Sequence, residues 1–255
     1  MKWFDFWLLL LLLLCTHTPR AAEDAPVVAV AANFTPALDE IVKQFTARTG
    51  KEIRISAGAT GTLVRQIEQG APFELFLSAD SEHVEYLQHR GYTRDDGRIY
   101  AVGVLVLYLP QGTRLKLMPD SAEIIKQLFV RQDTRIALAN PELAPYGLAG
   151  QQVLQRFGQW HRLQDRVVLG ENVGQAAQFA MSGSVDAALL PLAFTLNPDM
   201  QKSGQFQNIP PDWYAPIRQH MVLLKNAGRT ATELYEFISG EAARQIIRKY
   251  GYALP

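Results

Sequence analysis

Short apolar segments that alternate with amphipathic helical segments constrain the fold of this chain more than any other feature of its sequence. Residues 27–32 form a continuous apolar run rich in β-branched side chains, which is typical of a strand buried on both faces of a parallel sheet. Thr35 and Pro36 follow as the expected N-cap and first helical residue, and apolar residues three and four positions apart predict a helix that ends near Gly50. Because this strand, turn and helix pattern recurs along the chain, the sequence predicts an α/β fold with mostly parallel sheets.

The remaining elements follow from the same patterns. Further strands are expected at residues 52–57, 75–77, 101–109, 135–139, 167–169, 186–190 and 217–224. Further helices are expected at residues 62–69, after Ser81 as N-cap, at residues 122–129, 148–157 and 174–182, and as a pair at the C-terminus. The polar, proline-rich stretch from Asn197 to Pro211 is assigned no regular element.

The N-terminus has the layout of a secretory signal peptide. Lys2 precedes an apolar run over residues 6–14, and a polar stretch follows it. The run is shorter than the roughly 20 apolar residues of a membrane-spanning helix. We therefore expect residues 1–22 to be removed and the mature protein to reach the periplasm, with the cleavage point left open. Cys15 follows three leucines, so lipid attachment at this cysteine is a minor alternative.

Charge and cysteine content exclude several classes of protein. The chain has 25 basic and 25 acidic residues, and removal of Lys2, Arg20 and Asp5 with the signal peptide leaves 25 − 2 = 23 basic and 25 − 1 = 24 acidic residues. This near-neutral balance offers no basic stripe for nucleic acid. Cys15 is the only cysteine, so a mature chain cut after it has no thiol for a disulfide or a metal.

Four expected strand ends carry small or donor-rich residues. They are Ala32 with Asn33, Ala59 with Thr60, Pro145 with Tyr146, and Asn172 with Val173. In open α/β sheets, ligands lie at the carboxyl ends of the strands, where the following helices present unpaired N–H groups. None of these side chains is charged, so such a site offers donors without a counter-charge. That combination suits a fully ionised anion, which has only acceptors.

The sequence around these strand ends resembles the periplasmic molybdate-binding proteins (ModA family) of ABC transporters. The segments that carry the resemblance are Val28–Asp39, Gly58–Asp80, Asn140–Gly147 and Arg248–Tyr252. The similarity covers essentially the whole mature chain and implies a two-lobed, type II solute-binding fold with the ligand in the cleft between the lobes. Each lobe is expected to be a mostly parallel sheet flanked by helices, with residues 23–102 and 218–255 in lobe 1 and residues 103–217 in lobe 2.

The resemblance also implies a set of ligand-binding residues. Ala32 and Asn33 fall where the family donates hydrogen bonds from the start of its first helix, and Thr60 falls where it has a serine hydroxyl. Tyr146 and Val173 fall where the second lobe contributes, chiefly through backbone N–H groups. Some members of the family have a tyrosine at the position of Pro191. Proline has neither a hydroxyl nor an N–H to donate, so the resemblance implies that Pro191 is not a ligand and that Asn33 is the more important donor.

The function implied by the resemblance is the capture of molybdate, and of tungstate, and its delivery to the membrane permease of an ABC importer. We expect a monomer that needs no cofactor, with molybdenum present only as bound molybdate and without direct bonds from protein to metal. The main alternative is a sulfate- or other oxyanion-binding protein of the same fold, since cavity size cannot be obtained from sequence. An enzyme is not expected, because the chain contains neither a Gly-x-Ser-x-Gly elbow nor a His-Glu-x-x-His pair.

Each of these residues also has a structural interpretation. Asn33 could be a turn residue and Thr60 a helix cap. For Asp80 a capping or strand-end role is favoured over a role as metal ligand. The histidines at positions 83, 89, 161 and 220 show no metal-ligand spacing. The loop from Gly58 to Gly61 lacks the lysine of a phosphate-binding P-loop.

Overall fold

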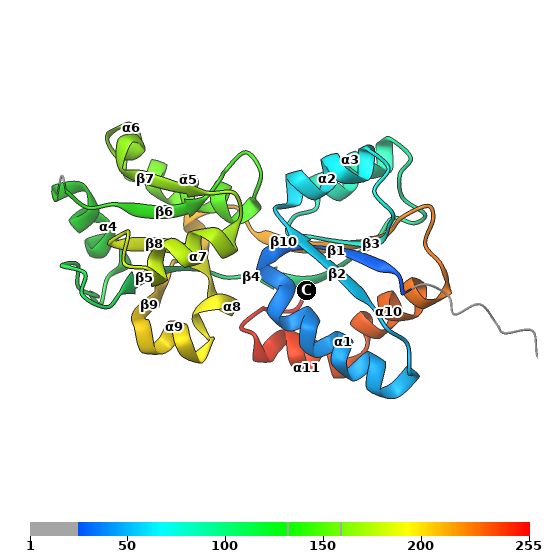
Figure 1. The fold of residues 1–255 in the computed structure, drawn as a ribbon. Helices are drawn as coiled ribbons and strands as arrows, with labels where there is room; N and C mark the ends of the chain where they lie inside the picture. The colour runs from blue at the N-terminus through cyan, green and yellow to red at the C-terminus, as the bar shows by residue number, and fades with distance from the viewer. Residues whose placement is uncertain (1–24, 132, 159) are drawn as a thin grey trace, which may run out of the picture.

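The computed structural model describes residues 25–131, 133–158 and 160–255, so the predicted signal peptide and Cys15 lie outside the described residues. Two five-stranded sheets lie side by side (Figure 1), with strand orders β2-β1-β3-β10-β4 and β7-β6-β8-β5-β9. In each sheet four strands point one way, and a single strand, β10 or β5, runs against its neighbours. This arrangement confirms the predicted two-lobed α/β fold.

The first sheet forms lobe 1 and the second forms lobe 2. Lobe 1 contains β1 (Val27–Ala31), β2 (Arg54–Gly58), β3 (Phe73–Ser78), β4 (Arg98–Gly103) and β10 (Ile217–Leu223). Lobe 2 contains β5 (Leu105–Pro110), β6 (Ile136–Ala139), β7 (Val167–Gly170), β8 (Ala187–Pro191) and β9 (Gly204–Asn208).

Helices cover both faces of each sheet, which is why the central strands β1, β6 and β8 are apolar throughout. In lobe 1, α2 and α3 pack on one face and α1, α10 and α11 on the other (Figure 1). The lobe 1 helices are α1 (Thr35–Thr49), α2 (Thr60–Glu68), α3 (Glu82–His89), α10 (Arg229–Ser239) and α11 (Glu241–Lys249), and the 3₁₀ turn η1 (Ala32–Phe34) precedes α1. Lobe 2 and its connection back to lobe 1 contain α4 (Ser121–Val130), α5 (Pro145–Arg156), α6 (Trp160–Leu163), η2 (Gln164–Arg166), α7 (Val173–Met181), α8 (Leu192–Thr195), α9 (Pro198–Ser203) and η3 (Pro211–Trp213). Among the described helices, none is both long and apolar enough to cross a membrane.

The apolar run expected as one strand over residues 101–109 is two strands in two different sheets. β4 ends at Gly103 and β5 begins at Leu105, so the chain leaves lobe 1 and enters lobe 2 at Val104. Ala101 and Gly103 near the end of β4 are buried, as is all of β5, so no change of polarity marks the break. The crossover places the hinge between the lobes next to the carboxyl-end residues of the sheets.

Two helix starts differ from the sequence expectation. Thr35 is not the cap of α1, because the 3₁₀ turn over Ala32–Phe34 makes the chain helical before it and moves the N-cap to Phe34, with no side-chain cap bond. The Ser81 side chain makes no cap bond either. The Asp80 carboxylate accepts a hydrogen bond from His83 N at 3.1 Å, so Asp80 has the structural capping role favoured from sequence.

The segment assigned no regular element contains α9 and β9. β9 pairs only at one side, with β5, and its sequence is polar, so hydrophobic periodicity does not reveal it. The start of α5 was expected at Leu148 and lies at Pro145 instead. This earlier start matters, because it places Tyr146 in the first turn of a helix.

Candidate functional site

Four helix starts, two from each lobe, meet at one small cavity between the lobes. The cavity lies where η1 and α2 of lobe 1 face α5 and α7 of lobe 2. Its lining consists of Ala31, Ala32, Asn33, Gly58, Ala59, Thr60, Ala79, Ala144, Pro145, Tyr146, Asn172 and Val173. The five residues predicted from sequence as ligands all belong to this set, and Pro191 does not.

The helix starts supply backbone donors to the cavity. First-turn N–H groups have no acceptor inside their own helix, and Thr60, Tyr146 and Val173 lie in the first turns of α2, α5 and α7. Asn172 caps α7 by accepting from the N–H groups of Gly174 at 2.9 Å and of Gln175 at 3.2 Å. The cap therefore does not use the N–H of Val173.

The Asn33 side chain is fixed by two partners from distant parts of the chain. Its amide Nδ2 donates to Gln219 Oε1 at 2.8 Å and to Tyr252 Oη at 3.1 Å, and Tyr252 Oη donates to Asn33 O at 2.7 Å. An amide nitrogen has two hydrogens, so a hydrogen bond from Nδ2 to an anion would compete with the longer contact to Tyr252.

Thr60 is placed to donate from its hydroxyl. Its Oγ1 accepts a hydrogen bond from Ala79 N at 3.3 Å, and a hydroxyl that accepts in this way still has its own hydrogen to give. The Thr60 side chain is buried. It is not the N-cap of α2, since that position belongs to Ala59.

The Tyr146 phenol lies at the hinge. An added Cβ on Gly103, the last residue of β4, would lie 2.1 Å from Tyr146 Oη, so the phenol packs directly over this glycine. Burial raises the pKa of Tyr146 well above that of a free tyrosine. The phenol is therefore neutral at physiological pH.

The lining carries no charged side chain, and the pair formed by His83 and Asp80 lies outside it. His83 Nδ1 lies 2.8 Å from Asp80 Oδ2, and both side chains are partly exposed. Across the described residues, no cluster of three His, Cys, Asp or Glu side chains could hold a metal ion. The cavity therefore presents N–H, amide and hydroxyl groups to a ligand.

The lobes touch around the cavity. The N–H of Gly61, at the start of α2, donates to the carbonyl of Leu143, which lies in the loop before α5, at 2.9 Å. An added Cβ on Gly61 would meet the Leu143 backbone at 3.4 Å. The structure thus shows the lobes in a closed arrangement.

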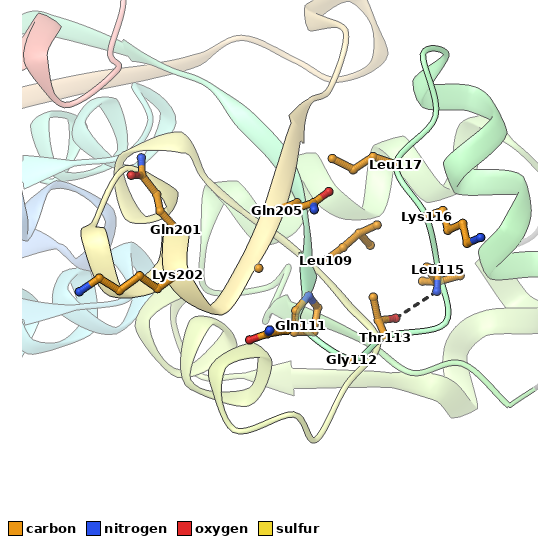
Figure 2. A pocket seen from close by; sticks show the side chains of 12 residues that line it. Leu109, Gln111, Gly112, Thr113, Leu115, Lys116, Leu117, Gln201, Lys202 and Gln205 are labelled. Carbon is orange, nitrogen blue, oxygen red and sulfur yellow. Dashed lines mark hydrogen bonds between the residues drawn. The ribbon is translucent and has the colours of Figure 1, made fainter.

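A more open hollow at the far end of lobe 2 is a poorer candidate (Figure 2). It lies between the ends of β5 and β9 and the loop over residues 111–117. Its two lysines, Lys116 and Lys202, point to opposite sides, and Thr113 Oγ1 accepts from Leu115 N at 3.3 Å within the loop. No set of donors converges there.

Sequence reasoning did not identify Ala79, Gly103, Gln219 and Tyr252 as parts of the site or of its support. Gln219 had one available signal, because it shares a strand face with the apolar residues Ile217 and Met221, while Arg218 and His220 point to the other face. Its side chain is fully buried, and burial of an amide is costly unless it is hydrogen-bonded.

Two lobes joined by a strand crossover, with half a donor set on each, define a two-lobed solute-binding protein. The model of the family described as "Bacterial extracellular solute-binding protein" matches residues 26–253. The molybdate-binding protein ModA of Azotobacter vinelandii is 36% identical over 238 residues, which cover 92% of each chain. The solved structure of the periplasmic molybdate-binding protein of A. vinelandii matches with a TM-score of 0.81 and 33% identity over 90% of this chain and 99% of that one.

The chain belongs to the bacterial extracellular solute-binding proteins and, within them, to the ModA family. The sulfate-binding protein SubI of Mycobacterium tuberculosis has a TM-score of 0.72 at 14% identity, covering 89% of this chain and 86% of that one. At this level of identity the similarity concerns the fold alone.

Proposed function

We propose that this protein binds molybdate, with tungstate as a second ligand, and delivers it to the membrane permease of an ABC importer. The observation that supports this most is the uncharged donor lining between four helix starts. Each α-helix N-terminus carries about half a positive elementary charge, so several of them offset a dianion without a basic side chain. The similarity to the ModA relatives indicates that the ligand is molybdate.

The proposed ligand-binding residues are Ala32, Asn33, Thr60, Tyr146 and Val173. Thr60, Tyr146 and Val173 would donate backbone N–H groups, and Thr60 would add its hydroxyl. These groups come from both lobes, so one tetrahedral anion with four acceptor oxygens can be bound from both sides. Phosphate fits less well, because at neutral pH it keeps a proton that requires an acceptor.

We expect molybdate and tungstate to raise the melting temperature strongly, and sulfate and phosphate to raise it weakly. The stabilisation follows RT ln(1 + [L]/Kd), which gives about 2.7 kcal/mol at about one hundred times Kd. Thermal unfolding with each anion at matched ionic strength measures this, and native mass spectrometry with the same panel ranks the complexes. An equal shift with sulfate would replace the molybdate assignment by a general oxyanion or sulfate binder.

We also expect the lobes to close on the ligand, since each lobe carries half of the donor set and the Gly61 to Leu143 bond joins them in the closed form. Small-angle scattering should show a smaller radius of gyration with saturating molybdate than without it. A weakly binding anion from the panel is the matched control. Identical scattering curves with and without molybdate would contradict closure.

The location and assembly follow from the same proposal. Residues 1–22 act as a signal peptide, the mature chain works as a monomer in the periplasm, and the permease recognises the closed pair of lobes. Mass determination of the exported chain tests the cleavage, because a lipid on Cys15 would add the mass of its acyl chains.

A further inference from the structure

We propose that Gln219 is a positioning residue of the anion site, which holds Asn33 and Thr60 in one fixed relation through a chain of hydrogen bonds. This inference rests on the proposed function, because it concerns two residues of that same site. Gln219 does not line the cavity, so it would act through the residues that do.

The hydrogen-bond chain runs from one proposed ligand residue to the other. Asn33 Nδ2 donates to Gln219 Oε1 at 2.8 Å, and Gln219 Nε2 donates to Ala79 O at 3.4 Å. Ala79 N in turn donates to Thr60 Oγ1 at 3.3 Å. Through Ala79, the single side chain of Gln219 therefore connects the loop after β1, the loop after β3 and the start of α2.

The donor and acceptor directions along these hydrogen bonds fix the orientation of the Asn33 amide. Gln219 Nε2 also lies 3.4 Å from the carbonyl of Ile217, so two carbonyl groups hold its nitrogen and leave its oxygen toward Asn33. Tyr252 donates its own hydrogen to Asn33 O, so its oxygen also accepts from the amide. Both partners therefore require the nitrogen of the Asn33 amide, and an anion would take the hydrogen that now goes to Tyr252, the longer of the two contacts.

The pairing of β4 with β10 is irregular next to Gln219. Along the β4–β10 pair, Gln219 lies opposite Ala101 and His220 lies opposite Ile99, so Tyr100 is an extra residue on β4. Such a bulge re-aims side chains next to functional sites. Gln219 is fully buried on a strand that both crosses near the hinge and pairs with β3, which carries the Ala79 loop.

The test is a double-mutant cycle between Gln219→Met, which keeps the approximate shape without hydrogen bonds, and Asn33→Ala. We expect Gln219→Met alone to weaken molybdate binding on the order of 10-fold, the size expected when a buried hydrogen-bonding group loses its partner. In the Asn33→Ala background the same change should have a much smaller effect, because coupled residues are not additive. Calorimetric titration measures all four proteins.

A matched control separates positioning from general loss of a buried hydrogen bond. Thr134→Val in lobe 2 removes the hydroxyl of a residue that is 1% exposed, and this hydroxyl donates to Arg131 O at 2.9 Å. Thr134 precedes the start of β6, whereas the lining residues Ala144 to Tyr146 follow its end. This control should lower the melting temperature and leave molybdate affinity unchanged. If Gln219→Met lowers molybdate affinity by the same factor in the unmodified protein and in the Asn33→Ala variant, Gln219 has a purely structural role and the inference is overturned.

A second variant keeps the test decisive if Gln219→Met does not fold. In Gln219→Glu the carboxylate cannot donate to Ala79 O, whereas the protonated acid can donate there and still accept from Asn33. Burial favours the protonated form, so its affinity relative to the unmodified protein should recover as the pH falls from about 9 to about 6. A pH-independent ratio would contradict the inference. If the unmodified protein binds molybdate and both Gln219 variants bind it equally well, only the positioning role is refuted. If the unmodified protein binds no oxyanion, the proposed function itself is refuted.

Discussion

Asn33→Asp is expected to cause the largest loss of molybdate affinity of any single change at this site. The substitution keeps the shape of a side chain that is 2% exposed and replaces its donating nitrogen by a carboxylate oxygen. That oxygen would face Gln219 Oε1, which lies 2.8 Å from the present nitrogen, and would sit beside the dianion. At about 4 Å and an effective dielectric constant of about 20, two unit charges repel by about 4 kcal/mol, and the doubly charged ligand increases this.

Asn33→Ala is the matched comparison. It removes a donor without adding charge, so its cost should be about 1.5 to 3 kcal/mol, as for one hydrogen bond to a charged group. The expected order of affinity is the unmodified protein, then the alanine variant, then the aspartate variant. Because burial raises the pKa of the new carboxyl group, the aspartate variant should regain part of its affinity as the pH falls.

Calorimetric titration with molybdate at neutral and mildly acidic pH measures this order. The melting temperatures of the ligand-free proteins should be recorded beside it, since both substitutions also disturb the contacts to Gln219 and Tyr252. If Asn33→Asp binds as tightly as the unmodified protein, Asn33 does not belong to the site.

Gly103→Ala should weaken binding by obstructing the closed form. The new Cβ would lie 2.1 Å from Tyr146 Oη and 2.8 Å from its Cζ, so the phenol would have to move. α5 cannot easily shift, because its Gly147 lies so close to β6 that a Cβ there would be 2.2 Å from Ala139 O. Overpacking of this kind costs about 1 to 3 kcal/mol, which corresponds to a roughly 5- to 150-fold loss of affinity at about 1.4 kcal/mol per factor of ten.

The double variant Gly103→Ala with Tyr146→Phe isolates the cause. Removal of the phenol oxygen deletes the shortest contact, so part of the affinity lost in the single Gly103→Ala variant should return. Scattering should show the single variant less compact than the unmodified protein at saturating molybdate. A Gly103→Ala variant that binds and closes normally would show that the phenol can leave the hinge without cost.

The anion site divides into a part that local sequence reveals and a part that it does not. Asn33 and Thr60 follow neighbouring strands of the first sheet, and Tyr146 and Val173 follow neighbouring strands of the second, so each pair could be predicted to meet at the carboxyl edge of its own sheet. The direction of the Tyr146 side chain could not, since it depends on the start of α5 and on the space above Gly103.

The supporting residues come from much farther along the chain. Gln219 and Tyr252 are 186 and 219 positions from Asn33, and no local periodicity links residues at such distances. The break between β4 and β5 was missed for a related reason. Both halves of the apolar run are buried, so hydrophobicity alone does not reveal that they belong to different lobes.

The sequence by itself determined the α/β class, most of the helices and strands, and the uncharged strand ends that face the cavity, because hydrophobic period and helix-start residues act within a few neighbouring positions. Tertiary structure alone decided that Gln219 orients the Asn33 amide and that Gly103 makes room for Tyr146. These contacts join β10 and the C-terminal segment to η1, and α5 to the end of β4, only after both lobes have packed against the hinge. A buried amide or phenol takes its direction from whichever partners surround it, and those partners are brought together by the whole fold.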